Sequence, residues 1–232
     1  MMLKSDLFNS IPVLLFLACI ANAAFGVRPS LITMQVKRGE YNGWIEVSHF
    51  EGEIPHAVEL IVKERILDFD GNVKDTLVVN GDFLIYPSRI VLYPKETVRV
   101  QVLYRGKEKI NADKAFVLYA REIPLPEGQK EERTIMTIAV MVNYSVGILM
   151  DTGKPGSLSF VSSRNLDSGR VELVMENKSQ GRFPLEGAYI MAGKNKIADF
   201  SGKTNSVMPG QKRRFVFNHN RPLYAEEVKF GK

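Results

Sequence analysis

The sequence contains few residues whose type and spacing could support catalysis or hold a metal ion. Its three histidines, His49, His56 and His219, are not clustered, and its one cysteine is Cys19. A hydrolytic triad brings a nucleophile, a base and an orienting group together, and zinc sites use clustered ligands, as in the HExxH and CxxC motifs. Neither motif occurs, and the glycines form no phosphate-binding loop. We therefore expect no enzyme, no cofactor, no metal site and no small-molecule substrate, and surface or turn positions for the histidines.

Asp68 and Asp70 in the segment DFDGN are a further candidate for chemistry. Alternating carboxylates begin many calcium loops, but the other ligands of such a loop do not follow at the required spacing. A compact turn explains the segment better, because Gly71 and Asn72 tolerate positive φ. The sequence therefore favours a turn over a metal site here.

The composition is that of a globular protein. Of the 232 residues, 45% are hydrophobic and 25% are charged, which supplies enough apolar material for a core and excludes a disordered chain. A chain of this length favours two domains of modest size. The net charge is +5, but basic residues stand beside acidic ones, as in KEERT, and no basic run alternates with aromatic residues. We therefore expect no nucleic-acid partner.

The N-terminus carries the clearest local signal. After MMLKSDLFNS comes IPVLLFLACIANA, an apolar run too short to span a bilayer that ends in the small-x-small pattern Ala21-Asn22-Ala23. We interpret residues 1–23 as a secretory signal peptide cleaved after Ala23, with an uncleaved anchor or lipidation at Cys19 as alternatives. Cleavage would remove the cysteine, so the mature protein would fold without a disulfide. This favours a location in the bacterial periplasm.

From Val27 onward, apolar residues alternate with polar ones and turn residues interrupt the pattern. A period of two is typical of strands, and no segment keeps a helical period over three turns. The Gly, Pro and Ser of MDTGKPGSLS indicate a domain boundary. We predict an all-β protein with two β-sandwich domains, one over residues 24–150 and a smaller one over residues 157–232.

The segment TIMTIAVMVNYSVGILM, residues 134–150, stays apolar for longer than a half-buried strand requires. One interpretation is a strand that is covered on both faces, by its own sandwich or by the neighbouring domain. The other is a strand that extends beyond its sheet and offers alternate side chains to a partner that lacks a strand. The two faces of the segment hold even-numbered and odd-numbered residues respectively: Met136, Ile138, Val140, Val142 and Tyr144 against Ile135, Ala139 and Met141.

The order of several motifs resembles that of the PapD-like periplasmic chaperones, which assemble pili and related fibres with an outer-membrane usher. Arg121-Glu122-Ile123-Pro124 in ADKAFVLYAREIP matches the REIP segment of this family directly. Three further stretches resemble strands and turns of the family: YPSRIVLYPKETVRVQVLYRG, VELVMENKSQGRFPL, in which a strand closes on Asn177, and VMPGQKRRFVF. The resemblance covers essentially the whole mature chain and implies two immunoglobulin-like sandwiches set at an angle.

The resemblance implies a function by donor-strand complementation, without a cofactor. A pilus subunit of this pathway lacks its last strand, and the chaperone lends its long G strand to fill the groove. The segment at residues 134–150 occupies that position, so we expect Met136, Ile138 and Val140 to form the donated stripe, with Ile135 as the alternative if the register slips by one. The implied partners are pilus or fimbrial subunits, the usher, and a second copy in a self-capped dimer. A two-domain envelope adaptor without subunit capping is the alternative function.

The resemblance also implies basic residues in the cleft between the domains, where they hold the C-terminal carboxylate of the subunit. The two corresponding positions, near residues 30 and 141, hold no basic residue. Arg28 and Lys37 are nearby cations and are the candidate anchors. Asp113 corresponds to the acidic member of the inter-domain ion pair of the family, but the arginine that usually pairs with it is absent from the sequence.

Overall fold

The computed structural model describes residues 25–50, 52–78, 81–125, 141–166, 169–200 and 206–231. Nearly all regular structure in these ranges is β-strand, and the helical part is the short 3-10 turn η2 (Val36–Arg38). Within these ranges, no helix is both long enough and apolar enough to cross a membrane. The signal peptide predicted over residues 1–23, with its cleavage after Ala23, lies outside the described residues.

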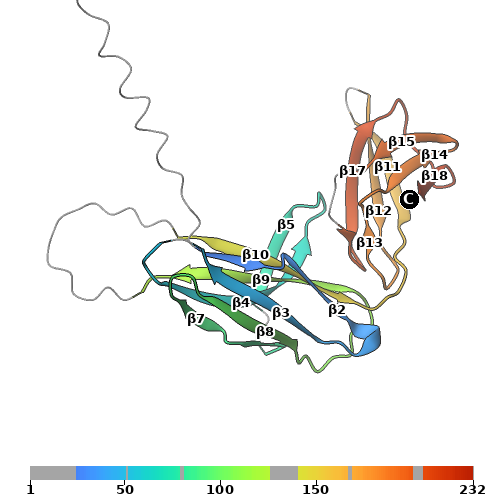
Figure 1. The fold of residues 1–232 in the computed structure, drawn as a ribbon. Helices are drawn as coiled ribbons and strands as arrows, with labels where there is room; N and C mark the ends of the chain where they lie inside the picture. Colours follow the sequence, from blue (N-terminus) through green and yellow to red (C-terminus); the bar gives the residue numbers. More distant parts are fainter. Residues whose placement is uncertain are drawn as a thin grey trace, which may run out of the picture.

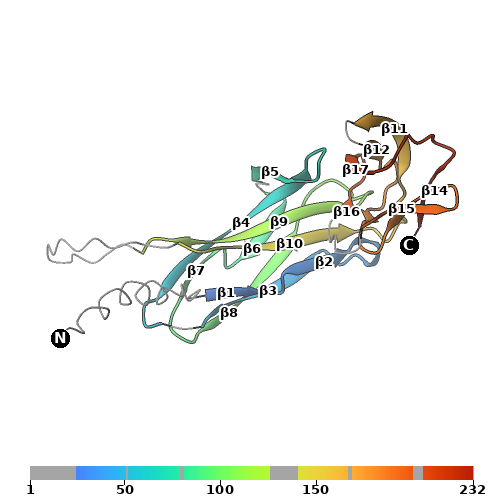
Figure 2. The ribbon, with the colours of Figure 1, turned by 90° about the horizontal axis from the view of Figure 1, so that it is seen from above.

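The first part of the chain forms a sandwich of two sheets (Figures 1 and 2). Within the described residues, a four-stranded sheet has the order β1-β3-β8-β6, and a six-stranded sheet has the order β2-β10-β9-β4-β5, with β7 joined to β4. The strands are β1 (Phe25–Arg28), β2 (Leu31–Gln35), β3 (Asn42–His49), β4 (His56–Leu67), β5 (Val73–Val78), β6 (Phe83–Tyr86), β7 (Arg89–Leu92), β8 (Thr97–Tyr104), β9 (Lys114–Ile123) and β10 (Asn143–Asp151).

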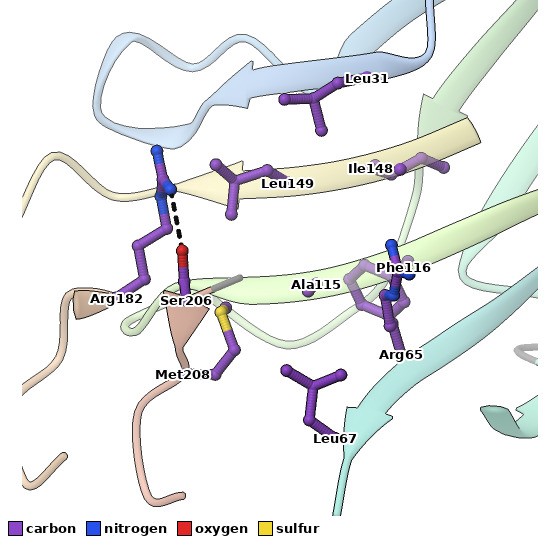
Figure 3. A pocket seen from close by; sticks show the side chains of 11 residues that line it. Leu31, Arg65, Leu67, Ala115, Phe116, Ile148, Leu149, Arg182, Ser206 and Met208 are labelled. Atoms are coloured by element: carbon purple, nitrogen blue, oxygen red, sulfur yellow. Dashed lines mark hydrogen bonds between the residues drawn. The ribbon is translucent and has the colours of Figure 1, made fainter. Parts of the chain in front are cut away.

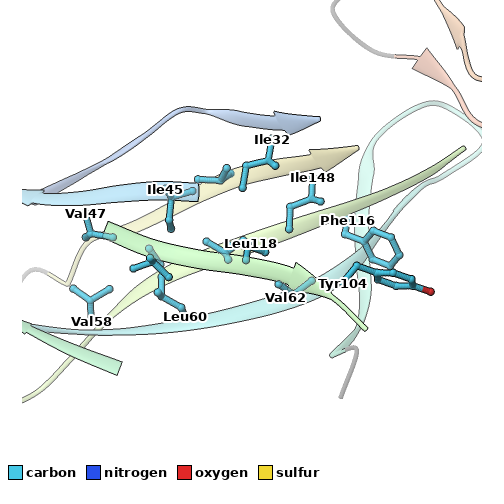
Figure 4. Packing of buried hydrophobic residues seen from close by; sticks show 14 of the residues in the cluster. Ile32, Ile45, Val47, Val58, Leu60, Val62, Tyr104, Phe116, Leu118 and Ile148 are labelled. Carbon is cyan, nitrogen blue, oxygen red and sulfur yellow. The ribbon is translucent and has the colours of Figure 1, made fainter. Parts of the chain in front are cut away.

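The alternation of apolar residues explains why these strands pack as a sandwich. Successive side chains of a strand point to opposite faces, so each sheet can bury one face against the other. In β8, for example, Val100 and Val102 are fully buried, while the residues between and before them are more exposed. Figure 4 shows the resulting core, to which Ile45 of the four-stranded sheet and Leu118 and Ile148 of the six-stranded sheet contribute.

The first two strands belong to different sheets. β1 pairs antiparallel with β3, whereas β2 pairs parallel with β10. The chain crosses from one sheet to the other at Arg28-Pro29, where the peptide bond is cis. As a result, β2 covers β10 along only part of its length.

The second part of the chain forms a smaller sandwich that stands at an angle to the first, beyond the end of β10 (Figure 1). Its described strands pair as β11-β12-β17, β13-β16 and β15-β14-β18. They are β11 (Ser159–Leu166), β12 (Arg170–Glu176), β13 (Phe183–Pro184), β14 (Tyr189–Ala192), β15 (Asn195–Asp199), β16 (Ser206–Val207), β17 (Lys212–Asn218) and β18 (Val228–Gly231). It has a buried core of its own: Leu173, Met175, Leu185, Ala188, Ile190, Phe200, Val207 and Phe215.

The turn expected at DFDGN connects β4 to β5. The turn uses the positive φ that Gly71 allows (90°), whereas Asn72 does not adopt a positive φ. Asn72 instead donates hydrogen bonds from its backbone N to Asp68 Oδ1 (2.8 Å) and from its side chain to Asp68 Oδ2 (3.0 Å). These bonds hold the pKa of Asp68 below its ordinary value. The side chain of Asn72 therefore closes the turn, and the carboxylate of Asp68 serves as its acceptor.

Candidate functional site

Strand β10 has different neighbours along its two halves. Over Asn143–Met150 it pairs antiparallel with β9. On the opposite side, β2 pairs with Gly147–Asp151, beginning with a hydrogen bond in which Gly147 N donates to Ser30 O at 2.9 Å. Along Asn143–Val146, no other described strand takes that side. We call Asn143–Val146 the open half and Gly147–Asp151 the covered half.

The open half is a sheet edge whose polar backbone groups are directed outward. Glu122 N donates to Val142 O at 3.2 Å, so the backbone groups of Val142 face β9, whereas Gly147 N faces β2. Alternate residues of a strand direct these groups to opposite sides, so Asn143 and Ser145 direct theirs away from β9. Such an edge is a template for pairing with another strand.

The even-numbered side chains of β10 face the interior of the first sandwich. Val146 and Ile148 are 1% exposed, and Met150 is completely buried. Tyr144 packs edge-on against the ring of Phe25, with 5.1 Å between the ring centres. One face of β10 is therefore packed in the core, although one edge of the strand is open.

Asp113, directly before β9, fastens the residue that follows β10. Its Oδ1 accepts hydrogen bonds from Thr152 N (2.8 Å) and Thr152 Oγ1 (2.6 Å), and its Oδ2 accepts one from Arg182 N of the second sandwich (2.9 Å). Asp113 N donates to Gln180 O, also at 2.9 Å. In the part of the chain that the structure describes, no cation pairs with this buried carboxylate. Backbone and hydroxyl donors satisfy it instead, and they link the two sandwiches.

Glu122, near the end of β9, fastens the residue that precedes β10. His56 Nδ1 donates to Glu122 Oε1 at 2.5 Å, and Val142 N donates to Glu122 Oε2 at 3.0 Å. The ring of His49 lies 4.9 Å from that of His56, and His49 is only 3% exposed. The expectation of surface or turn positions was therefore wrong for His49 and His56, because both belong to strands and lie at the end of the core. His219 lies in the loop after β17.

A cleft of about 160 Å³ lies between the sandwiches, beside the covered half of β10 (Figure 3). Two arginines line it, Arg65 from β4 and Arg182 from the residue before β13. Arg182 Nη1 donates to Ser206 Oγ at 3.2 Å, and among the side chains that the structure describes, which exclude those of residues 75–80, no carboxylate pairs with either arginine. The remaining walls are largely apolar: Leu31, Leu67, Ala115, Phe116, Gly147, Ile148, Leu149 and Met208. The cleft thus suits an anionic group with apolar neighbours.

The turn between β4 and β5 holds the second sandwich beside this cleft. Arg214 N donates to Phe69 O at 2.9 Å, and Arg214 Nε donates to Asp70 Oδ1 at 2.5 Å. The hydrogen bond to Asp70 raises the pKa of Arg214, whereas burial lowers the pKa of the neighbouring Arg213. The guanidinium of Arg213 occupies the space beside Gly71 that a side chain would fill. The two sandwiches are therefore joined at this turn as well as through Asp113.

Arg28, one of the two candidate anchors named from the sequence, does not line the cleft. Arg28 ends β1, and its guanidinium lies 5.8 Å from the centre of the Phe50 ring. It lines a hollow with Trp44 and Arg99 of the four-stranded sheet. Lys37 lies in η2, and its side chain is outside the described part of the chain. The predicted donor residues are also outside it: Met136, Ile138, Val140 and Ile135.

Sequence reasoning missed Arg65 and Arg182, although a signal for one of them exists. Val58, Leu60 and Val62 of β4 are buried, so the odd-numbered Arg65 belongs to the outer face of that strand. The alternation therefore identifies Arg65 as an outward-facing cation. Arg182 has no comparable signal, because its position depends on how the second sandwich packs against the first.

No protein-family model and no curated protein matches the chain. Among solved structures, it is similar to a chain of the chaperone–tip adhesin complex of CFA/I fimbriae, with 13% identity, a TM-score of 0.58, and coverage of 90% of this chain and 98% of that one. It is also similar to the class 5 fimbriae chaperone CfaA, with 12% identity, a TM-score of 0.55, and coverage of 89% and 97%. A third similar structure is the CsuC–CsuE pre-assembly complex of Acinetobacter baumannii, with 13% identity, a TM-score of 0.54, and coverage of 85% and 88%.

At these identities the similarity concerns the fold. It extends over both sandwiches, because each of these matches covers most of both chains. The protein thus has the fold of the fimbrial chaperones, with two immunoglobulin-like sandwiches set at an angle, and the predicted fold class is confirmed. The resemblance to PapD-like chaperones that the motifs indicate holds for the three-dimensional structure as well.

Proposed function

We propose that the protein is a periplasmic chaperone that binds a fimbrial subunit through the open half of β10 and delivers it to an outer-membrane usher. The observation that carries this proposal is the sheet edge itself, where Asn143 and Ser145 direct their backbone groups away from β9. The fold supports it, because two of the similar structures are complexes of a chaperone with a tip subunit. The signal peptide proposed at residues 1–23 accounts for export to the periplasm.

In this function, a subunit that lacks a strand pairs its own edge with β10. Backbone hydrogen bonds provide part of the affinity, and alternate side chains set the register. Even-numbered residues of β10 face the interior, so the same alternation, continued towards the N-terminus, places Met136, Ile138 and Val140 on one face. Full burial of each side chain contributes roughly 1.5–3 kcal/mol before ordering costs are counted. Ile135 takes over if the register shifts by one residue.

We further propose that Arg65 and Arg182 bind the C-terminal carboxylate of the subunit. Both line the cleft beside the covered half, whereas Arg28 lines a hollow with residues of the other sheet. Charge-assisted hydrogen bonds to two guanidinium groups would fix a carboxylate at the end of the paired subunit strand. Changing Arg65 and Arg182 to alanine should therefore weaken capture, while Arg28→Ala, the matched control, should not. The reverse result would place the anchor at Arg28.

Co-expression tests the function. The protein is produced in a bacterial periplasm with the products of its neighbouring genes, purified through a tag, and weighed by native mass spectrometry. We expect a one-to-one complex with a small subunit that lacks a strand. Changing Met136, Ile138 and Val140 together to threonine should abolish the complex, because threonine replaces three apolar side chains by smaller or equally branched polar ones.

The matched control changes the opposite face of the same segment, with Ile135, Ala139 and Met141 replaced by threonine. Loss of the complex with the even-numbered triple alone supports the proposed stripe, and loss with the odd-numbered triple alone supports the shifted register. If the unaltered protein is recovered folded and without a subunit, and the even-numbered triple only lowers its stability, the proposal is overturned. The two-domain envelope adaptor would then be the better description.

A further inference from the structure

Glu122 is an acidic residue on the inner face of the six-stranded sheet. It stands opposite Val58 of the core across the β4–β9 pairing, and it continues the even-numbered series of β9 to which the buried Ala120 belongs. Its side chain is 15% exposed. A carboxylate in this position needs hydrogen-bond donors, and it finds them in His56 Nδ1 and Val142 N.

These contacts belong to a closed circuit of side-chain and backbone contacts at the end of the first sandwich. The ring of His56 lies 6.2 Å from that of Phe25, which in turn packs edge-on against Tyr144. Tyr144 is two residues from Val142, and Val142 is bonded to Glu122 twice, through its N to the carboxylate and through its O to Glu122 N. The start of β10 is therefore held to β9, β4 and β1 together.

His49 packs against the His56 side chain of this circuit. Its Nε2 lies 2.9 Å from Ile54 O and must donate to it, because a carbonyl oxygen only accepts. Its Nδ1 is buried and has no hydrogen-bond partner among the described residues. The ring of His49 packs against that of His56, whose Nδ1–H is directed at Glu122.

We infer that Glu122 is a positioning residue that sets the register in which the chain enters β10. This inference rests on the proposed function, because the register decides which face the open half and the segment before it present to a subunit. A slip of one residue moves every side chain of a strand to the opposite face, so the point at which the chain enters β10 has to be fixed. Glu122 opposes the slip because it holds both the N–H and the C=O of Val142. A slipped strand would break both hydrogen bonds and leave the carboxylate with His56 Nδ1 as its remaining donor among the described residues.

Amide hydrogen exchange, followed by NMR on the full mature chain, measures this role without any subunit. The variant Glu122→Leu removes the acceptor of Val142 N, and loss of a hydrogen bond to a charged group should speed exchange of that amide by about tenfold or more. Other amides of β9 and β10 should change little. Glu122→Gln keeps one acceptor oxygen without the charge and should give an intermediate rate.

Glu59→Leu is the matched control. Glu59 lies on the neighbouring strand β4, is also 15% exposed, and has two cationic partners, Arg89 and Arg121. It does not contact the backbone of β10, so exchange at Val142 should stay unchanged. An unchanged Val142 rate in both Glu122 variants would overturn the inference, and so would an equal acceleration along all of β10, which would indicate only a general loss of stability. If Glu122→Leu does not fold, Glu122→Gln decides.

The capture assay then separates this inference from the proposed function. We expect Glu122→Leu to lower the yield of the subunit complex by at least about tenfold while Glu59→Leu keeps it, since a wrong register misplaces every side chain of the stripe. If the unaltered protein captures a subunit and Glu122→Leu captures it equally well, the positioning role is wrong and the function stands. If the unaltered protein captures nothing, the function is wrong, and the exchange rates still report whether Glu122 holds the register.

Discussion

The two ends of β10 are fastened by the same device in different surroundings. Asp113, just before β9, binds the residue after β10, and Glu122, near the end of β9, binds the residue before it. At the Asp113 end, β2 covers the strand and the second sandwich contributes Arg182 N as a further donor. At the Glu122 end, no described strand covers the outer edge. One strand thus joins a closed end to an open one.

The two halves of β10 therefore differ in the use of their backbone groups. Those of the covered half stabilise the fold, and the outward ones of the open half are available to a partner. The covered half has hydrogen-bonding neighbours on both sides, so its backbone contributes to the native structure. The open half has one neighbour, and its outward N–H and C=O groups are satisfied by water or by another strand. Because Glu122 fastens the open half without covering it, the edge is ordered and accessible at once, which favours pairing with a partner at a low ordering cost.

The largest effect should come from emptying the core beneath the covered half. Ile148 is 1% exposed, so Ile148→Ala should lower the free energy of unfolding by about 2–5 kcal/mol through lost burial and a residual cavity. Ser145→Ala in the open half should change it by less than about 0.5 kcal/mol, because its side chain is exposed. Denaturant unfolding measures both, and similar losses would erase the contrast between the halves.

A smaller effect is expected at the closed end. Asp113→Ala leaves three donors of Thr152 and Arg182 without their acceptor and should cost about 1–3 kcal/mol in unfolding free energy. Thr152→Val removes only the hydroxyl donor and keeps the backbone one, so it should cost about 1 kcal/mol. A loss from Asp113→Ala no larger than that from Thr152→Val would show that the link to the second sandwich adds nothing.

The backbone of the open half can be tested with proline. Ser145→Pro removes an N–H that faces the open edge, so it should cost about 1 kcal/mol or less in stability, as expected at an edge strand. The same change should lower capture of a subunit by at least about tenfold, because the N–H is needed for strand pairing. Leu149→Pro removes an N–H directed at β2 and should destabilise the fold far more. Capture that survives Ser145→Pro would show that the edge is not used.

Alternation along single strands is what made the fold predictable. WIEVSHF and ELIVKER reveal β3 and β4 because each buries every second residue, and the family motifs indicate how the strands are ordered. The apolar run at residues 134–150 was expected to be one long strand, and within the described residues the strand begins at Asn143. A run that is apolar on both faces marks no boundary, so the place where pairing begins could not be read from it.

The site was less predictable because its contacts join distant parts of the chain. His56 follows Pro55 and reads as a turn residue, yet its partner Glu122 lies 66 positions away in a strand that the fold brings alongside. The arginines of the cleft come from different sandwiches, so no local pattern links them. Asp113 was noticed only through the family resemblance. Its acceptance of hydrogen bonds from backbone N–H groups cannot be predicted from residue types, because nearly every residue has such a group.

The smallest effect on the free energy of unfolding should come from changing Glu59. This residue belongs to neither half of β10 and serves as the reference position. Its carboxylate accepts hydrogen bonds from Arg89 and Arg121, which lower its pKa below the ordinary value of 4.5. Both arginines are more than half exposed, so Glu59→Gln should cost less than about 1 kcal/mol at neutral pH.

The pH dependence of the stability that Glu59 contributes tests whether its two arginines hold its carboxylate. The folded protein binds the proton of Glu59 less tightly than the unfolded chain does, so the stabilisation is complete above the unfolded pKa and is lost as the pH falls through the lower, folded pKa. The difference in melting temperature between the unaltered protein and Glu59→Gln should therefore be present at pH 7 and shrink towards zero below pH 4.5. A difference that grows on acidification would mean that the carboxylate is not held by its arginines, and the control used for Glu122 would have to be replaced.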